Sequence, residues 1–303
     1  MKVAVSGATG LIGGALAARL IREGHDVVPL VRRPVSTGEP AIAWDPARGT
    51  IDRNALEGCD AVVNLAGESV FGRWSAEKKR RIRESRVNGT RLVSEAIARL
   101  SRPPRVLLAA SAIGYYGDRG ATELTEESSP GDDFLAEVAR DWEAGTGPAA
   151  QAGVRVVNTR FGIVLTPAGG LLGSLLPPFR LGLGGPIGSG TQYVSWIALG
   201  DVLDVLLFLI ATDSISGPVN VTAPHPLPNL EFVRTLGRVL RRPSVIPVPG
   251  FALQVILGQE AAAMMVGGQR VLPARLVAAG YRFHHADLEP ALRHLLAAPA
   301  GGS

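Results

Sequence analysis

The chain has 303 residues, of which 46% are hydrophobic and 19% are charged. This length and composition predict a soluble, cytoplasmic protein with one large or two modest domains. The formal net charge of +4 is too modest to indicate a nucleic-acid partner by itself. Cys59 is the only cysteine, which excludes a disulfide framework, and the five histidines are scattered, so no metal site is expected. The longest strongly apolar run, near residues 205–211, is too short to span a membrane, so no membrane partner is expected.

The first predicted elements are a strand, a glycine turn and a helix. Residues 6–14 read SGATGLIGG and lie between a β-branched run and a segment of helix-favouring residues. Gly7 allows the tight turn, Gly10 lets a pyrophosphate approach the backbone, and Gly13 lets the helix pack closely on the strand. This order predicts a dinucleotide-binding βαβ unit, whereas regularly spaced glycines would interrupt the apolar helix of a signal peptide.

The second predicted strand, residues 26–31, bears on the choice between the two nicotinamide dinucleotides. In a fold that prefers NAD, this strand ends in an acid that accepts hydrogen bonds from the ribose 2′-hydroxyl. Arg32 and Arg33 take this place here, and an arginine fork suits a 2′-phosphate. The sequence therefore predicts NADP(H), and the alternative is that both arginines are solvated charges at a strand end. Pro29 is unexpected in this strand, because proline cannot donate a ladder hydrogen bond.

Further apolar runs, at residues 60–67, 105–110 and 154–160, alternate with helical segments. One of these helices begins with the basic run 78–83. It has no interleaved aromatic residues for base stacking, so a solvated face is favoured over nucleic-acid binding. The alternation predicts an α/β fold with a Rossmann-type, doubly wound parallel sheet, whose ligands lie at the carboxyl ends of the strands.

The character of the sequence changes beyond about residue 165. The stretch GGLLGSLLPPFRLGLGGPIGSG is dense in glycine and proline with little periodicity, which predicts a long functional loop. A helix at residues 201–211, a strand at 219–221 and C-terminal helices follow. We expect a dinucleotide-binding domain over residues 1–165, to which residues 195–222 return, and a smaller, discontinuous C-terminal α/β substrate domain over residues 166–303.

A set of short motifs covers nearly the whole chain. They are GATGLIG (7–13), NLAGE (64–68), RWS (73–75), SAIGYYG (111–117), RFGIVL (160–165), FRLGLGGPIGSG (179–190), SWI (195–197), GGQRVLP (267–273) and AAGYRF (278–283). Together they resemble the NAD-dependent epimerase/dehydratase-like branch of the extended short-chain dehydrogenases/reductases, and within it the SDR39U1-like oxidoreductases with their C-terminal DUF1731-type region. The resemblance implies a bound dinucleotide and a cytosolic setting.

The resemblance also extends the expected cofactor site. It implies that Leu65, Ala66 and Gly67 line the adenosine with backbone atoms, and that Arg86 contacts a phosphate or the ribose. The complete expected cofactor-binding set is Gly7, Thr9, Gly10, Leu11, Ile12, Gly13, Arg32, Arg33, Leu65, Ala66, Gly67, Arg86 and Ser111.

The usual catalytic pair of this superfamily is missing. Its enzymes place a tyrosine and, four residues later, a lysine on one helix face, where the ammonium lowers the pKa of the phenol. None of the four tyrosines here has a lysine four residues on, and the helix expected at residues 133–142 has apolar residues in these places. Tyr115 and Arg119 have the right separation, but Gly117 argues against a helix between them.

Ser111, Tyr116 and Tyr115 are the candidate catalytic groups instead, because they match the SAxGYYG motif of the subfamily. An unassisted tyrosine is only about one part in a thousand ionised at pH 7, so it can donate a proton but is a poor base. We therefore predict that Ser111 and Tyr116 donate hydrogen bonds to a substrate carbonyl, with Tyr115 as a third donor, and that carbonyl reduction is favoured over alcohol oxidation. The alternative is that these hydroxyls only satisfy the loop backbone. Candidate substrate contacts, with core packing as their alternative, are Gln192, Tyr193 and Trp196.

Two functions therefore remain open. The first is a reductase or epimerase-like enzyme that uses NADP(H) on an unknown small carbonyl or sugar-like substrate, which the Ser111–Tyr116 motif favours. The second is a non-catalytic, NADP(H)-sensing regulatory or scaffold protein whose redox-dependent shape a partner reads, which the missing Tyr–Lys pair favours. A homodimer is left open as well.

Overall fold

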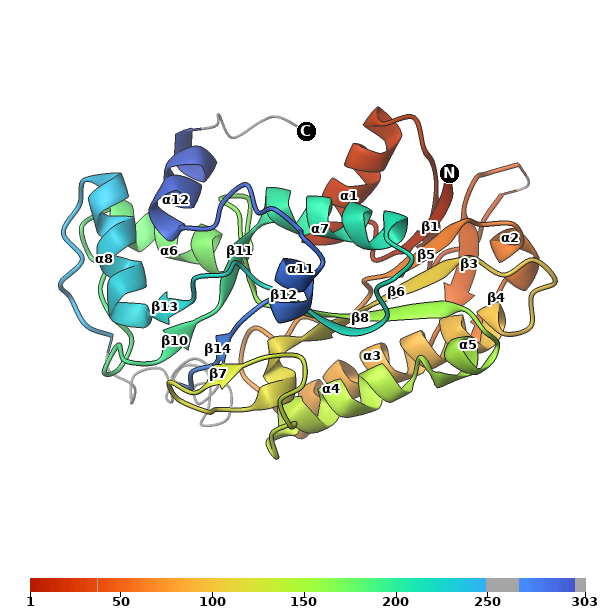
Figure 1. Cartoon of the computed structure of the whole chain (residues 1–303), viewed down its shortest axis with the longest axis horizontal. Coiled ribbons are helices and arrows are strands. Elements are labelled where there is room, and N and C mark those ends of the chain that lie inside the picture. The colour runs from red at the N-terminus through yellow and green to blue at the C-terminus, as the bar shows by residue number, and fades with distance from the viewer. Residues whose placement is uncertain (37, 249–266, 298–303) are drawn as a thin grey trace.

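A large, mainly parallel sheet is the centre of the structure, a computed structural model that describes residues 1–36, 38–248 and 267–297 (Figure 1). Its strand order is β12-β8-β6-β5-β1-β2-β3-β4, and neighbouring strands are parallel except for β3 and β4. The order confirms the predicted doubly wound α/β fold. It reverses between β1 and β5, and ligands of such sheets bind at the carboxyl ends of these two strands. The strands are β1 (Lys2–Ser6), β2 (Asp26–Val31), β3 (Ile42–Asp45), β4 (Thr50–Ile51), β5 (Ala61–Asn64), β6 (Val106–Ala112), β8 (Arg155–Phe161) and β12 (Gly217–Val221).

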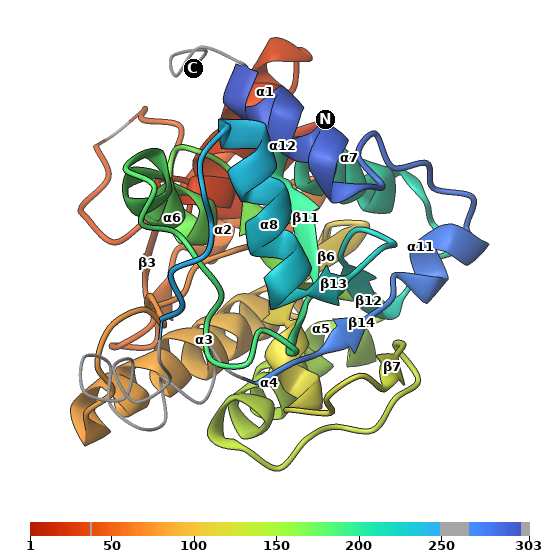
Figure 2. The same cartoon turned by 90° about the vertical axis from the view of Figure 1, so that its left-hand side faces the viewer.

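Helices cover both faces of this sheet, as Figures 1 and 2 show. Successive residues of a strand point to opposite faces. Val3 and Val5 of β1 therefore pack with α1 and α7, whereas Ala4 packs with α3. The helices of the first face are α1 (Leu11–Arg22) and α7 (Leu199–Ala211), and those of the second are α2 (Arg53–Leu56), α3 (Ala76–Ile97), α4 (Phe134–Ala144) and α5 (Gly147–Gln151).

One part of the molecule, at one end of its long axis, lies away from the sheet (Figure 1). Three helices share an apolar core there with a short antiparallel strand pair. They are α6 (Gly170–Arg180), α8 (Asn229–Leu240) and α12 (Leu288–Ala297), and the strands are β10 (Tyr193–Val194) and β13 (Leu227–Pro228). Two parallel pairs lie between this end and the sheet, β9 (Ile163–Leu165) with β11 (Trp196–Ala198) and β7 (Glu123–Leu124) with β14 (Arg270–Val271). The short helices are η1 (Ile113–Tyr116) and α11 (Ala274–Ala278).

On the basis of these separate cores we propose the division into two domains that the sequence suggested. Ile197, α7 and β12 pack into the core of the sheet, in line with a return of residues 195–222 to the first domain. Leu276 of α11 packs into the same core, although the sequence placed it with the second domain. Among the helices that the structure describes, none combines the length and the hydropathy needed to cross a membrane.

The glycine-rich stretch after residue 165 was wrongly expected to be a loop throughout, because its first part forms α6. Leu172, Leu176 and Phe179 recur at helical spacing and are buried in the second core. This burial holds the helix together although two prolines lie inside it. The apolar periodicity was hidden by the abundance of glycine and proline around it.

The structure also explains how an internal strand accommodates Pro29. Pro29 of β2 lies opposite Val5 of β1. The pairing of β2 with β3 starts one residue later, at Leu30. The missing N–H group therefore falls where one neighbouring strand has not yet begun.

Candidate functional site

The first glycine loop joins β1 to α1 where the sheet order reverses. Gly7 has a φ of +68°, a left-handed conformation that favours glycine, and a Cβ there would lie 2.9 Å from the backbone after β5. A Cβ on Gly13 would lie 2.2 Å from the carbonyl oxygen of Gly7, so the helix and the loop pack backbone against backbone. A Cβ on Gly10 would meet only that same oxygen, at 3.2 Å, so the loop is open at this position. Around this opening Thr9, Gly10 and Leu11 are exposed, whereas Ile12 and Gly13 turn toward the core.

Ser6 ties this loop to the segment after β5. Its hydroxyl donates to Asn64 Oδ1 (2.5 Å) and accepts from the backbone N–H groups of Leu65 (3.0 Å) and Ala66 (3.1 Å). Asn64 in turn donates to Thr90 of α3 (2.8 Å). These bonds hold the two loops side by side, as a shared dinucleotide site requires. The sequence did not indicate that Ser6 and Asn64 connect these two loops.

Arg86 of α3 supports the loop after β5 from inside. Its Nη1 donates to the carbonyl oxygens of Glu68 (2.8 Å) and Ile82 (3.2 Å), and its guanidinium lies 5.0 Å from the ring of Trp142. A Cβ on Gly67 would lie 3.3 Å from Arg86 Cζ, so the glycine lets the guanidinium approach the backbone. Burial lowers the pKa of Arg86 to about 10, and the carboxylate of Glu68 acts in the opposite direction. Its contact with a phosphate or the ribose stays a prediction.

Arg32 and Arg33 follow the carboxyl end of β2, next to the glycine loop, and both are exposed. Arg33 is bound by Glu39, with Nη1 to Oε2 at 3.0 Å and Nη2 to Oε1, and it also donates to the carbonyl oxygen of Pro34. In the described part of the chain, no residue pairs with Arg32. Of the two arginines, Arg32 is therefore the one whose guanidinium is free to meet a 2′-phosphate.

A hydrogen-bonded network joins β6, η1, α4, β8 and β12. Ser111, near the end of β6, donates to Glu143 Oε1 of α4 (2.7 Å). Arg160 of β8 holds the same carboxylate with two bonds, from Nε to Oε1 (2.7 Å) and from Nη2 to Oε2 (2.8 Å). Its Nη1 donates to the hydroxyl of Tyr116 (2.9 Å), which donates its own proton to Asn220 Oδ1 (2.7 Å). Ser111 is 2% exposed and Tyr116 is fully buried, so the network belongs to the interior.

This network changes the roles expected for the three hydroxyls. Ser111 and Tyr116 donate their hydroxyl hydrogen bonds to Glu143 and Asn220. In this structure neither hydroxyl can therefore donate to a substrate carbonyl. Tyr115, expected only as a third donor, is half-buried and stacks on the guanidinium of Arg160, 3.5 Å from Cζ to the ring centre. Its hydroxyl has no hydrogen-bond partner within the described residues. Of these three hydroxyls, that of Tyr115 is therefore the one that can donate a hydrogen bond to a substrate.

Tyr116 gives the site a measurable dependence on pH. Burial raises the pKa of its phenol to about 12, with the Arg160 charge acting in the opposite direction. The stability from the neutral, bonded phenol is present below pH 10, the unfolded value, and is lost as the pH rises toward 12. Between pH 9 and 11, we expect the stability gap between the wild type and Tyr116→Phe to narrow by about 1 kcal/mol in urea unfolding. A gap of constant size at both pH values would contradict this account of the buried phenol.

The three candidate substrate contacts have different surroundings. Trp196 is fully buried in the second core and donates to the carbonyl oxygen of His225 (3.2 Å), so it is a core residue rather than a substrate contact. Gln192 is 8% exposed and donates to the carbonyl oxygen of Ile187 (2.9 Å). Tyr193 is half-buried beneath Arg270, with 5.3 Å from Cζ to the ring centre. Only Tyr193 retains a surface that a substrate could reach.

Glu143 and Arg160 carry the network but were not identified from the sequence. A signal for each was present. Arg160 alternates with Val156 and Asn158 on one face of a buried strand, and a charge at such a position implies a partner. Glu143 follows the buried Ala136 and Ala139 at helical spacing. What the sequence could not supply is the pairing of these two side chains across α4 and β8.

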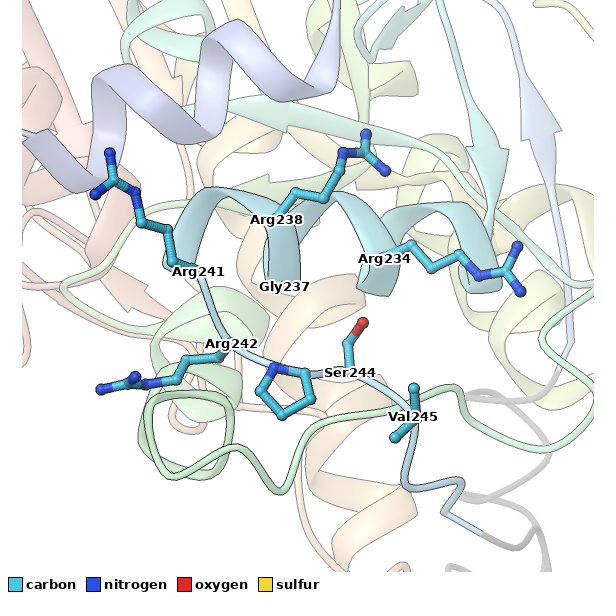
Figure 3. A pocket seen from close by; sticks show the side chains of 8 residues that line it. Arg234, Gly237, Arg238, Arg241, Arg242, Ser244 and Val245 are labelled. Atoms are coloured by element: carbon cyan, nitrogen blue, oxygen red, sulfur yellow. The ribbon is translucent and has the colours of Figure 1, made fainter.

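A second feature, at the C-terminal end of α8, does not fit a catalytic site. This is a surface depression of about 510 Å³, and its arginine side chains diverge instead of converging on one point (Figure 3). Its lining includes Arg234, Arg238, Arg241 and Arg242 and neither the glycine loop nor Ser111. Within the described ranges, no cluster of histidine, cysteine or acidic side chains could hold a metal ion.

The sequence matches two family models. The model of the NAD dependent epimerase/dehydratase family covers residues 3–222, and a domain of unknown function, DUF1731, covers residues 248–295. Epimerase family protein MT2273 of Mycobacterium tuberculosis is 42% identical over 298 residues, which are 98% of each chain. The similarity therefore includes both parts of the molecule.

Two solved structures are similar to this one over nearly its whole length. The human epimerase family protein SDR39U1 (isoform 2), solved with NADPH, is 37% identical with a TM-score of 0.89, over 97% of this chain and 99% of that one. A nucleoside-diphosphate sugar epimerase from Corynebacterium glutamicum is 38% identical with a TM-score of 0.80, over 98% of this chain but 58% of that one.

Proposed function

Because the chain belongs to the NAD-dependent epimerase/dehydratase family, we propose that it is an NADP(H)-dependent oxidoreductase or epimerase-like enzyme acting on a small carbonyl or sugar-like substrate. The observation that carries this proposal is the glycine loop, open at Gly10, together with Arg32, which follows the next strand and has no partner among the described residues. The NADPH held by the human relative supports the same dinucleotide. A cytoplasmic location is part of the proposal, in line with a single, buried thiol at Cys59.

The residues at the ends of β1 and β2 suit a dinucleotide, since a Cβ on Gly10 would meet only one backbone oxygen and Arg32 is exposed. When bound, the nicotinamide would supply a hydride acceptor or donor. The pyrophosphate would meet the backbone at Gly10 and the N-terminus of α1, and the 2′-phosphate would meet Arg32. Tyr115 would donate a hydrogen bond to the substrate oxygen, since no described residue binds its hydroxyl and Arg160 holds its ring in place.

A non-catalytic, NADP(H)-sensing regulator is the second candidate. It is favoured by the missing Tyr–Lys pair and by the internal bonds of Ser111 and Tyr116. The two candidates separate in a screen with dicarbonyl compounds and nucleotide sugars that follows both NADPH oxidation and product formation, since an epimerase regenerates its dinucleotide. Turnover of any substrate supports the enzyme, whereas tight NADPH binding without turnover in the whole screen supports the regulator. A homodimer stays a prediction in either case.

We expect NADPH to bind at least tenfold more tightly than NADH, a difference of about 1.4 kcal/mol. Arg32→Ala should remove most of this preference, because no described residue binds Arg32 while Glu39 binds Arg33. Arg33→Ala is the matched control and should have the smaller effect. Fluorescence titration of the three proteins with both dinucleotides measures the difference. Equal affinities of the wild type for NADPH and NADH would refute the assignment of the 2′-phosphate site.

A further inference from the structure

Glu143 is a largely enclosed carboxylate with an unusual set of partners. Its side chain is 12% exposed and that of Arg160 is 3% exposed. Oε1 accepts one bond from Arg160 and one from Ser111, and Oε2 accepts the second bond from Arg160. The arginine fixes the position of the carboxylate through a two-pronged contact, and the serine is its only neutral donor among the described residues.

Ser111 lies near the carboxyl end of β6, the edge of the sheet at which ligands of such folds bind, and it is one hydrogen bond away from this carboxylate. Its one proton points to Glu143, and no described residue donates a hydrogen bond to its oxygen. The lone pairs of Ser111 Oγ are therefore not engaged by any described residue. A hydroxyl backed by a carboxylate can take up a proton on one side while it gives up its own on the other.

We infer that Glu143 accepts and returns the proton of the reaction through Ser111, and that Arg160 positions Glu143 for this task. The inference rests on the proposed function. In the oxidation of an alcohol, the substrate O–H bond breaks and a Ser111 O–H bond forms, while the original Ser111 proton moves to Glu143 Oε1. The electron pair of the substrate C–H bond leaves as hydride to the oxidised dinucleotide, and the product is a carbonyl. Reduction reverses each of these transfers.

Arg160 itself is not the source of the proton. Burial acts to lower the pKa of its guanidinium, but the bonds and the charge of Glu143 raise that pKa above its ordinary value. Arg160 therefore keeps its charge and holds the carboxylate in place. With a carboxylate available as acceptor, alcohol oxidation no longer depends on an ionised tyrosine. This removes the basis for the sequence-based expectation that carbonyl reduction is favoured at neutral pH.

The hydrogen bond can be tested without cofactor or substrate. In a double-mutant cycle of Ser111→Ala and Glu143→Gln, we expect the two changes to be coupled by about tenfold or more in the unfolding equilibrium constant. Ser111→Ala leaves the ion pair intact, so it remains informative if Glu143→Gln does not fold. Glu137→Gln, on the exposed side of α4, is the matched control for both changes. Additive effects would overturn the Ser111–Glu143 contact.

The proton transfer is tested by turnover against pH, with diacetyl and NADPH in one direction and acetoin and NADP⁺ in the other. Ser111→Ala and Glu143→Gln should lower turnover about 100-fold or more in both directions and flatten the pH profile, whereas Glu137→Gln should not. Glu143→Asp should restore part of the rate with a shifted profile. Normal turnover in folded, NADPH-binding Glu143→Gln or Ser111→Ala would overturn this inference and leave the proposed function standing. A wild type that binds NADPH but turns over neither compound nor any member of the screen would overturn the proposed function, and the inference with it.

Discussion

Replacing Gly10 with valine is expected to weaken NADPH binding about 100-fold or more, close to 3 kcal/mol, while the protein stays folded. Gly10 has an ordinary backbone conformation, with φ −82° and ψ 174°, so its dihedral angles accept a side chain, and the Cβ would press only on the Gly7 oxygen at 3.2 Å. It would project into the one open position of the glycine loop, which is the approach of the pyrophosphate. The measurement is fluorescence titration, together with thermal unfolding with and without NADPH.

Gly13 provides the matched contrast within the same loop. A Cβ there would lie 2.2 Å from the Gly7 oxygen, so the backbone of β1 or α1 must move to accept it. We expect Gly13→Ala to lower the free energy of unfolding by about 3 kcal/mol, which Gly10→Val should not do. If added NADPH still raised the melting temperature of Gly10→Val by as much as that of the wild type, the glycine loop would not be the phosphate site.

Replacing Arg160 with methionine is expected to lower the free energy of unfolding by about 3–5 kcal/mol. The change removes both bonds to Glu143 and leaves its carboxylate buried with Ser111 alone. It also removes the bond to Tyr116 and the stacking on Tyr115. Urea unfolding of the cofactor-free protein measures the loss.

Two further variants make this result specific. Arg83→Met removes ion pairs of α3 with Asp141 and Glu137 that lie on the surface, so it should cost less than about 1 kcal/mol. Arg160→Met combined with Glu143→Leu removes both charges and should recover part of the stability, because no unpaired carboxylate remains buried. If Arg160→Met and Arg83→Met lowered the free energy of unfolding equally, the Arg160–Glu143 pair would stabilise the protein no more than a surface ion pair.

The parts of the fold that depend on neighbours in the sequence could be predicted. Short apolar runs and the spacing of the glycines predict the order β1, α1 and β2. The structure places Gly7 and Gly13 at close backbone contacts, as this spacing suggests. The positive charge of α3 was expected to be a solvated face, and several of its arginines are paired with acids of the same helix or of α4. These features depend on spacings of a few residues.

The candidate site depends instead on side chains that the sheet brings together from distant segments. Ser111, Glu143 and Arg160 lie on β6, α4 and β8, and the partner of Tyr116 lies on β12. Strand order decides which of these residues become neighbours, and periodicity says nothing about strand order. The bonding partners of Ser111 and Tyr116, which take the protons that were expected to reach a substrate carbonyl, could therefore not be located from the pattern.

The position of β12 has a consequence for the order in which a newly made chain can fold. β8 is an edge strand until β12 joins it, and β12 follows β8 in the chain only after β9, α6, β10, β11 and α7 have been made. At a synthesis rate of about 5–20 residues per second, the interval between the ends of these strands lasts about 3–12 s. During that time the exposed edge of β8 could pair with another nascent chain. Asn220 arrives with β12, so the bond that holds Tyr116 also forms late, and a ribosome-stalled or truncated product ending before residue 217 should aggregate rather than bind a dinucleotide.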